Sequence, residues 1–269
     1  MSQYYLKTGE ADRLRLERLG KIYNPFTQYF LQRHGLKPGM HVLEYGCGTG
    51  DMLCWLAQQV GPTGRVVGID AAEDQIEICR EKVKEKRLNN VELHTLKIED
   101  IASLNQTFDI AFGRWVLLFL ANPTHVAEQI LNHLKPRGTL IIETCEQANS
   151  GIHSEPEHPV FLEWRNMVER AFTSQGLSAH FATDVIKHFK TLPGLTIHAE
   201  CHQPILMTEE EKSVLRLGNL SNKDSLVNKL KLMTEAEADQ MIDTLAELEK
   251  IQNTVIWFYN NTLIALHKS

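Results

Sequence analysis

A short segment, HVLEYGCGTGD at residues 41–51, constrains the fold of this chain more than any other. An apolar run leads into Glu44 and is followed by glycines at alternate positions. Unbroken apolar residues are typical of a parallel strand that is covered on both faces, and glycines let backbone amides approach a ligand closely. From Asp51 onward, apolar residues recur at helical spacing. A strand, a glycine turn and a helix in this order predict a nucleotide-binding crevice.

Glu44 and Asp51 narrow the choice of ligand for this crevice. A dinucleotide-binding fingerprint has its third glycine where this chain has Asp51, and a Walker-type phosphate loop ends in Gly-Lys-Ser/Thr, which is absent from the sequence. The two acids would repel a pyrophosphate at the helix N-terminus, so they suit a positively charged ligand. S-adenosylmethionine meets this requirement because it carries a sulfonium, an ammonium and no phosphate. Asp70, which ends the next apolar strand (RVVGID), lies where a carboxylate would bind the ribose hydroxyls.

Five segments extend this pattern over about residues 38–145: HVLEYGCGTG, VVGIDAA, VELHTLKIEDI, FDIAFGRWVLLFL and HLKPRGTLIIE. With these segments in this order, the chain resembles the class I S-adenosylmethionine-dependent methyltransferases, in particular the group of the ubiquinone/menaquinone-biosynthesis methyltransferases. The resemblance implies an α/β, Rossmann-like fold with a seven-stranded, mostly parallel sheet and helices on both faces. The alternation of strands and helices by itself also requires a parallel sheet with right-handed crossovers.

The motifs imply that the cofactor binds at the carboxyl ends of the first four strands. The candidate cofactor-binding residues are Glu44, Gly46, Cys47, Gly48, Asp70, Ala71, Ile98, Glu99, Gly113 and Arg114. The family usually places an acid and a small residue against adenine, whereas this chain has Lys97 and Ile98 there. Adenine recognition is therefore expected from the Ile98 backbone amide, with Glu99 or Asp100 reaching the exocyclic amine. By resemblance Arg114 borders the methionine moiety, and its alternative role is an ion pair inside the fold.

Four segments describe the expected organisation of the chain. They are an N-terminal helical lid (1–37), the S-adenosylmethionine-binding core (38–206), an inserted helical cap (207–253) and the final strand of the core (254–269). The cap is predicted because an amphipathic helical pattern precedes the last strand-like run, VIWFYNNTLIALHK, in which the two asparagines mark a bulge. In the lid, a break is expected near Asn24-Pro25, since proline disfavours helical geometry in the preceding residue. The apolar stripe of the cap is expected to pack on the core, with a homodimer contact as the alternative.

Methyl transfer from a sulfonium is an in-line displacement that requires neither a protein nucleophile nor a metal ion. A general base is needed only for a poorly nucleophilic acceptor. The candidates for that base are Tyr4 and Tyr5 in the lid, and His153 and His158 in the polar loop after the fifth strand. The alternatives are partly ordered aromatic residues and solvent-exposed histidines. No cysteine or histidine spacing indicates a metal site.

Composition limits the function classes further. A net charge of −6 disfavours nucleic acid as a partner, because phosphate binding usually needs a basic patch. The N-terminus lacks a secretory signal pattern, and no apolar run approaches the ~20 residues that span a bilayer. Five widely separated cysteines fit a reduced, cytoplasmic protein. We expect a methyltransferase that uses S-adenosyl-L-methionine, releases S-adenosyl-L-homocysteine and methylates a small or medium, partly hydrophobic acceptor. The alternatives are a protein or RNA methyltransferase, a non-catalytic S-adenosylmethionine-binding protein and a nicotinamide oxidoreductase.

Overall fold

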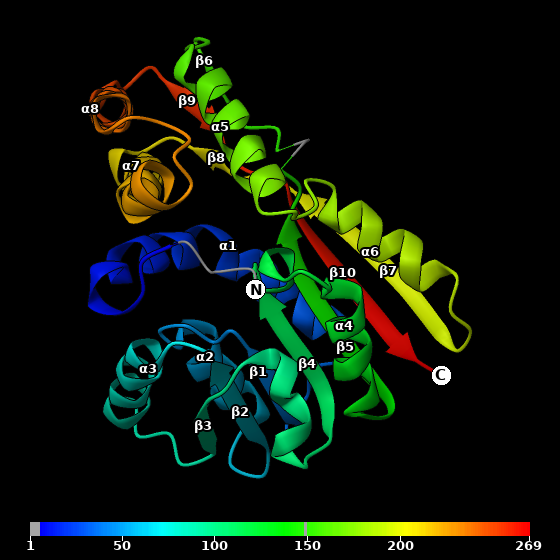
Figure 1. Cartoon of the computed structure of the whole chain (residues 1–269). Helices are drawn as coiled ribbons and strands as arrows, with labels where there is room; N and C mark the ends of the chain where they lie inside the picture. The colour runs from blue at the N-terminus through cyan, green and yellow to red at the C-terminus, as the bar shows by residue number, and fades with distance from the viewer. Residues whose placement is uncertain (1–5, 148–149) are drawn as a thin grey trace.

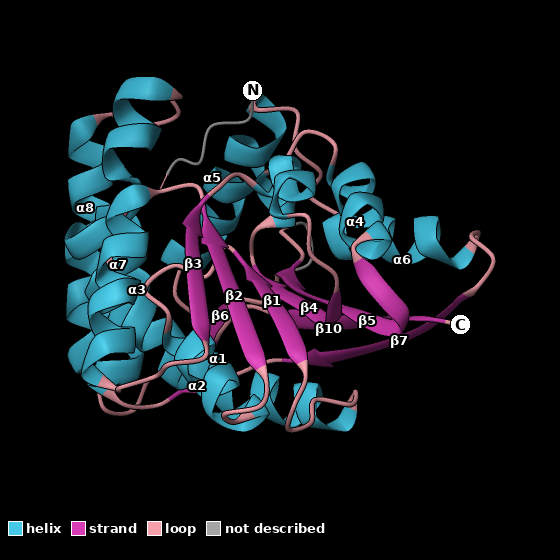
Figure 2. Ribbon diagram, turned by 90° about the horizontal axis from the view of Figure 1, so that it is seen from below, coloured by secondary structure: helices cyan, strands magenta, loops and turns pink. Residues whose placement is uncertain are grey.

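The computed structural model describes residues 6–147 and 150–269. Tyr4 and Tyr5, two of the candidates named above, lie outside the described residues. The central sheet has seven strands in the order β3-β2-β1-β4-β5-β10-β7 (Figures 1 and 2). Their bounds are β1 His41–Tyr45, β2 Arg65–Asp70, β3 Val91–Thr95, β4 Phe108–Arg114, β5 Leu134–Cys145, β7 Leu195–His202 and β10 Asn261–Lys268.

The directions of these strands confirm the predicted fold class. Neighbouring strands from β3 to β5 are parallel, and β10 runs antiparallel to both β5 and β7. The carboxyl ends of β1, β2 and β4 therefore meet at one edge of the sheet. In an open α/β sheet this edge is where ligands bind.

Helices cover both faces of the sheet, because consecutive strand residues point to opposite faces. The covering elements are α1 Arg13–Arg33, α2 Asp51–Val60, α3 Glu73–Glu85, η2 Ile98–Leu104, α4 Pro123–Asn132 and α6 Phe181–Lys190, with short 3-10 turns at η1 Gly9–Ala11 and η3 Leu117–Phe119. Val42 of β1 packs with residues of α1, α2 and α3 on one face. Leu43 belongs to the cluster that includes residues of η2, α4 and α6 on the other face.

The N-terminal helix α1 is continuous through Pro25, so the predicted break near Asn24-Pro25 is wrong. A proline inside a helix removes one backbone hydrogen bond, but the helix can continue through it if side-chain packing compensates for the loss. Here Pro25 is on the exposed side, while Tyr23, Thr27 and Phe30 are fully buried. The burial of this face stabilises the helix across the proline.

A second unit lies beyond the sheet edge, above α1 in Figure 1. It consists of α5 Val160–Ser174, α7 Glu209–Asp224, the π-helix η4 Ser225–Lys229, α8 Glu235–Lys250 and a small sheet of β6 His153–Glu155, β9 Val255–Trp257 and β8 Ile205–Leu206. Helices α7 and α8 each begin with a capping box, formed by Thr208 with Glu211 and by Thr234 with Glu237. Met241 of the predicted apolar stripe is buried within the chain, so the stripe is not available for a dimer contact.

The last strand-like run departs from the prediction of one bulged strand. Residues 258–260 leave the extended pairing, and the run divides into β9 of the small sheet and β10 of the central sheet. The Phe258 amide donates to the Pro204 carbonyl, and the Asn260 amide donates to the Ser150 carbonyl. These long-range hydrogen bonds turn the chain between the two sheets. The division of the chain at residues 37, 206 and 253 stays a prediction.

Candidate active site

The glycine turn after β1 occupies the ligand edge of the sheet. Gly46 has φ +66°, and a Cβ at this position would lie 2.2 Å from Cγ2 of Val116, so a side chain is excluded. The next residue, Cys47, is buried, and a hydrogen bond with Cys79 and burial together raise the pKa of its thiol well above the usual range. Its thiol is therefore neutral, and the turn presents backbone to a ligand.

Asp70 at the end of β2 lies directly beside this turn. Its Oδ2 accepts from the Gly48 amide at 2.9 Å and its Oδ1 accepts from the Ala72 amide at 3.0 Å. Burial raises the pKa of Asp70, while these backbone hydrogen bonds oppose the shift. The structure thus brings Gly48 and Asp70 together, as expected from the parallel arrangement of β1 and β2. Ala71 follows on the exposed rim.

Glu44 near the carboxyl end of β1 has a buried carboxyl group. The residue is 5% exposed, and its Oε2 has no hydrogen-bond partner among the described residues. Burial raises the pKa of Glu44 well above its ordinary value, and the charges of Asp51 and Asp70 add to this shift. An uncompensated buried carboxyl is costly, and a positively charged ligand group would offset that cost.

The other predicted cofactor residues lie at the ends of β3 and β4. Ile98 begins η2 with its side chain buried, whereas Glu99 is exposed. Gly113 packs against the ring of Tyr45, where an added Cβ would lie 2.1 Å from Cε2. The absence of a side chain at Gly113 therefore makes room for this buried tyrosine.

Arg114 makes the internal ion pair that the sequence left open as an alternative. Its Nε lies 2.9 Å from Oε2 of Glu143, its Nη1 donates to Asn24 Oδ1 at 2.9 Å, and its Nη2 donates to Thr27 Oγ1 at 2.9 Å. Asn24 and Thr27 belong to α1, and Glu143 belongs to β5. The arginine therefore holds α1 to the sheet beside the glycine turn.

Glu143 is a residue that sequence reasoning missed. Its side chain is fully buried, and it accepts from Thr27 Oγ1 at 2.9 Å and from Asn261 Nδ2 at 2.7 Å. Oδ1 of Asn261 in turn accepts from Trp115 Nε1 at 2.9 Å. The sequence signal for such a residue is a single acid within the apolar run TLIIETC. An acid in a buried strand indicates a polar partner, because acids are rarely buried without one.

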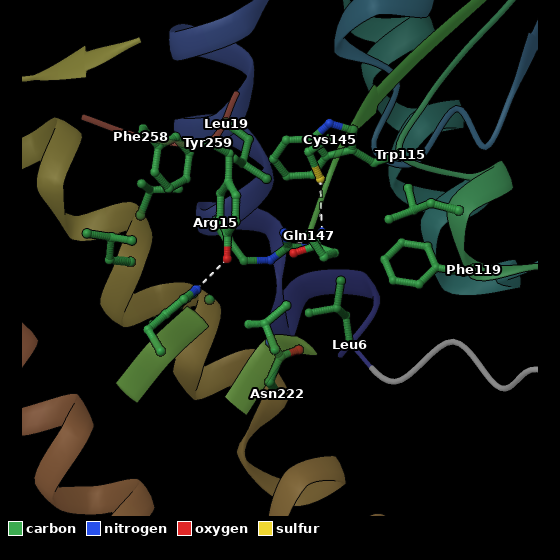
Figure 3. A pocket seen from close by; sticks show the side chains of 16 residues that line it. Leu6, Arg15, Leu19, Trp115, Phe119, Cys145, Gln147, Asn222, Phe258 and Tyr259 are labelled. Atoms are coloured by element: carbon green, nitrogen blue, oxygen red, sulfur yellow. Dashed lines mark hydrogen bonds between the residues drawn. The ribbon is translucent and has the colours of Figure 1, made fainter. Parts of the chain in front are cut away.

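A cavity of about 90 Å³ lies beside the ends of β4 and β5, between α1, α5 and α7 (Figure 3). Its lining residues are Leu6, Arg15, Leu19, Trp115, Leu118, Phe119, Cys145, Gln147, Trp164, Val168, Val214, Leu215, Gly218, Asn222, Phe258 and Tyr259. Most of these are apolar or aromatic, and Trp115 directly follows the β4 end that borders the glycine turn. The cavity and the crevice are therefore neighbours.

The polar groups in the wall of the cavity carry little net charge. Arg15 is buried and paired with Asp12, with Nε–Oδ1 and Nη2–Oδ2 distances of 2.7 and 2.5 Å. Burial raises the pKa of Cys145 to about 12 and raises that of the Tyr259 phenol above its ordinary value. Both groups are neutral at physiological pH. The Tyr259 hydroxyl also accepts a hydrogen bond from Trp164 Nε1.

Comparison with known proteins decides the family. Residues 36–181, more than half of the chain, match the family model described as "Methyltransferase domain". The chain belongs to the methyltransferase domain family. This match confirms the resemblance seen in the sequence, and it includes the glycine turn, Asp70 and Arg114.

Relatives of this methyltransferase domain agree with the assignment. A demethylmenaquinone methyltransferase of Symbiobacterium thermophilum is 29% identical over 144 residues, which are 52% of this chain and 55% of the relative. The chain thus matches about half the length of this curated relative. A putative methyltransferase from Bacillus halodurans C-125 superposes with a TM-score of 0.59, 18% identity and coverage of 90% of this chain and 97% of that chain. The [4+2]-cyclase SpnF gives a TM-score of 0.56 at 17% identity, covering 91% and 80%. At these identities the solved structures show the fold.

The two histidine candidates lie away from the cavity of this methyltransferase domain. His153 in β6 stacks on Trp257 with ring centroids 5.7 Å apart, and its Nδ1 lies 2.7 Å from the Gly151 carbonyl. His158 lines a separate groove between α5 and α8. Neither lines the cavity beside β4 and β5.

Within residues 6–147 and 150–269, no group of three or more histidine, cysteine and acidic side chains could hold a metal ion. In the same two ranges, none of the helices has the length and apolar character required to cross a bilayer.

Proposed function

We propose that this chain is an S-adenosylmethionine-dependent methyltransferase that methylates a small or medium, partly hydrophobic organic acceptor. The observation that carries the proposal is the pair of carboxylates, Glu44 and Asp70, at adjacent strand ends beside an apolar cavity. The family assignment and the resemblance to a demethylmenaquinone methyltransferase support it.

The residues of the crevice fit the proposed cofactor. The unpartnered Oε2 of Glu44 would accept from the ammonium of the methionine moiety. Asp70 bonds two backbone amides, but a carboxylate has about four lone-pair sites, so it would still accept from the ribose hydroxyls. The Ile98 amide, with Glu99 or Asp100, would face adenine. Arg114 would act indirectly, since its side chain holds α1 over the crevice.

The chain itself has to bind, orient and desolvate the reactants. When bound, S-adenosylmethionine supplies a methyl group that is activated by the sulfonium. Trp115 follows the end of β4 and lines the cavity, so it would orient the acceptor. The aromatic wall excludes water, which favours an in-line approach in a pocket of low polarity. A cavity lined mostly by apolar side chains favours a partly hydrophobic organic molecule over a protein or an RNA.

Binding of S-adenosylhomocysteine measured by calorimetry tests the cofactor assignment. We expect saturable heat for the wild type and strongly weakened binding for Asp70→Ala and Glu44→Ala, with the folded state checked by circular dichroism. Asp243→Ala on the exposed face of α8 is the matched control and should bind like the wild type. Absence of heat with both S-adenosylmethionine and its demethylated product in the wild type contradicts the proposal. Release of demethylated product with a panel of acceptors separates an enzyme from a non-catalytic binding protein.

A further inference from the structure

Two carbonyl oxygens in the cavity wall lack hydrogen-bond partners among the described residues. They are Oε1 of Gln147 and Oδ1 of Asn222, and both atoms are buried. Gln147 as a whole is 9% exposed. Buried polar atoms in folded proteins are nearly always paired, and an unpaired one costs free energy. These two oxygens are therefore positions at which a ligand would gain hydrogen bonds.

The two oxygens come from separate walls of the cavity. Gln147 follows the end of β5, and its Nε2 donates to Cys145 Sγ at 3.1 Å, which orients the amide. Asn222 lies near the end of α7. Figure 3 shows both side chains among the residues around the cavity, together with Trp115 and Phe119. A ligand in the cavity would thus be contacted by the Gln147 amide after β5 and by the Asn222 amide of α7.

The other polar groups of the lining already have protein contacts. Arg15 is paired with Asp12, and the Tyr259 hydroxyl accepts from Trp164. The charges of Arg15 and Asp12 compensate each other, so the cavity wall has no uncompensated charge that would favour a charged ligand. The unmet requirement in this part of the structure is for hydrogen-bond donors.

We propose that Gln147 and Asn222 determine acceptor specificity by accepting hydrogen bonds from a neutral, flat molecule that carries hydroxyl or amine hydrogens. The inference rests on the proposed function in that the cavity is the acceptor site. A ring of this class would pack against Trp115 and Phe119 while its hydrogens meet the two carbonyl oxygens. A purely apolar ring of the same shape would leave both oxygens unpaired and would bind more weakly.

Three probes of one shape test this selection: 4-ethylphenol, 4-ethylaniline and 4-ethyltoluene. Each is titrated by calorimetry into the protein saturated with S-adenosylhomocysteine. We expect the phenol and the aniline to bind at least about tenfold more tightly than the toluene, because pairing a buried oxygen outweighs the greater hydrophobicity of the methyl group. In Gln147→Leu and Asn222→Leu the preference for the aniline, whose two N–H hydrogens can pair both oxygens, should shrink. In the double variant the preference for both polar probes should reverse. Gln240→Leu, which makes the same change on the exposed face of α8, should keep the wild-type preference.

The outcomes separate this inference from the proposed function. Equal affinity for the three probes in the wild type, no binding of any probe, or an unchanged preference in the double variant overturns the role of Gln147 and Asn222. The heat of S-adenosylhomocysteine binding is measured first and reports on the cofactor site alone. If 4-ethyltoluene binds the Leu variants with the wild-type affinity, the cavity is folded in these variants.

Discussion

Glu143 and Arg114 form an ion pair in the interior of the sheet, with 2.9 Å between Oε2 and Nε. The pair lies near the carboxyl ends of β4 and β5. Thr27 of α1 contacts both members, so the pair also fixes the helix that runs between the sheet and α7. At its outer side α1 is tied to α7, because Arg18 and Lys21 both pair with Glu210. Helix α1 therefore links the two units that enclose the cavity.

Removing one partner of the buried pair should destabilise the protein strongly. Glu143→Leu leaves the Arg114 guanidinium without its carboxylate, and we expect a loss of about 3–5 kcal/mol in the free energy of unfolding. The double variant Glu143→Leu/Arg114→Met should cost less than the sum of the two single changes, because neither charge is then left alone. Urea unfolding measures all three. Arg13→Ala, which breaks an exposed pair with Glu10, is the control and should cost under about 1 kcal/mol. Additive effects of the two interior changes would contradict this account.

Gly46→Ala should weaken both stability and binding of S-adenosylhomocysteine. The new methyl group meets Cγ2 of Val116 at 2.2 Å, in addition to the strain of a positive φ, which costs about 1–2 kcal/mol. Gly176→Ala is the matched control, because Gly176 has φ +69° and open space around it. The Gly176→Ala variant should be destabilised by the backbone strain alone and should bind S-adenosylhomocysteine like the wild type. Thermal unfolding and calorimetry measure these effects. The second change Val116→Ala should restore part of the loss, and a failure to do so would argue against the clash.

Glu44 should make the unliganded protein less stable as the pH rises. Burial raises the pKa of Glu44 above its unfolded value of about 4.5, so between these two pKa values the folded state holds a proton that the unfolded state has lost. Stability from this group is complete below the unfolded pKa and is lost as the pH increases through the folded pKa. Glu44→Gln should therefore gain stability relative to the wild type from pH 4 to pH 8, measured by urea unfolding. If the free energy of unfolding has the same pH dependence in the variant and the wild type, this prediction is wrong.

Binding of S-adenosylhomocysteine should release a proton from Glu44. In the proposed placement the ammonium of the ligand would lie beside Glu44 and favour the ionised carboxylate, which would lower the pKa of Glu44 in the complex. Calorimetry in two buffers with different heats of ionisation measures the number of protons exchanged. The release should disappear in Glu44→Gln. The same proton release in the variant and the wild type would assign it to another group.

The histidine cluster at the end of α1 should cause acid sensitivity. Nδ1 of His34 lies 3.0 Å from Nε2 of His267, and burial together with repulsion from His267 and His198 lowers the pKa of His34 to about 4. Between pH 6.5 and 4 the unfolded chain binds a proton that the folded chain does not, so stability falls as the pH drops through this window. His34→Asn should flatten this dependence in urea unfolding, whereas the exposed His125→Asn should not. Greater acid sensitivity of His34→Asn than of the wild type would refute the assignment.

Local sequence patterns were sufficient to predict the sheet and the crevice. Each of the decisive patterns spans only a few residues. They are the apolar run that ends in Glu44, the glycine turn and the second apolar run that ends in Asp70. Strand formation and glycine conformation depend mainly on such short-range constraints. The parallel order of the strands then required both acids to meet at one edge, and the structure has the Gly48 amide bonded to Asp70.

Only the tertiary structure decided the features that depend on distant partners. Helix α1 passes through Pro25 because its buried face packs on the sheet, and the last strand-like run divides because its Phe258 and Asn260 amides donate to the Pro204 and Ser150 carbonyls. The partners of Arg114 come from α1 and β5, and Gln147 and Asn222 are 75 positions apart in the sequence but line one cavity. Hydrophobic patterns set which elements form, whereas the pairing of a buried charge or amide depends on how those elements pack in three dimensions.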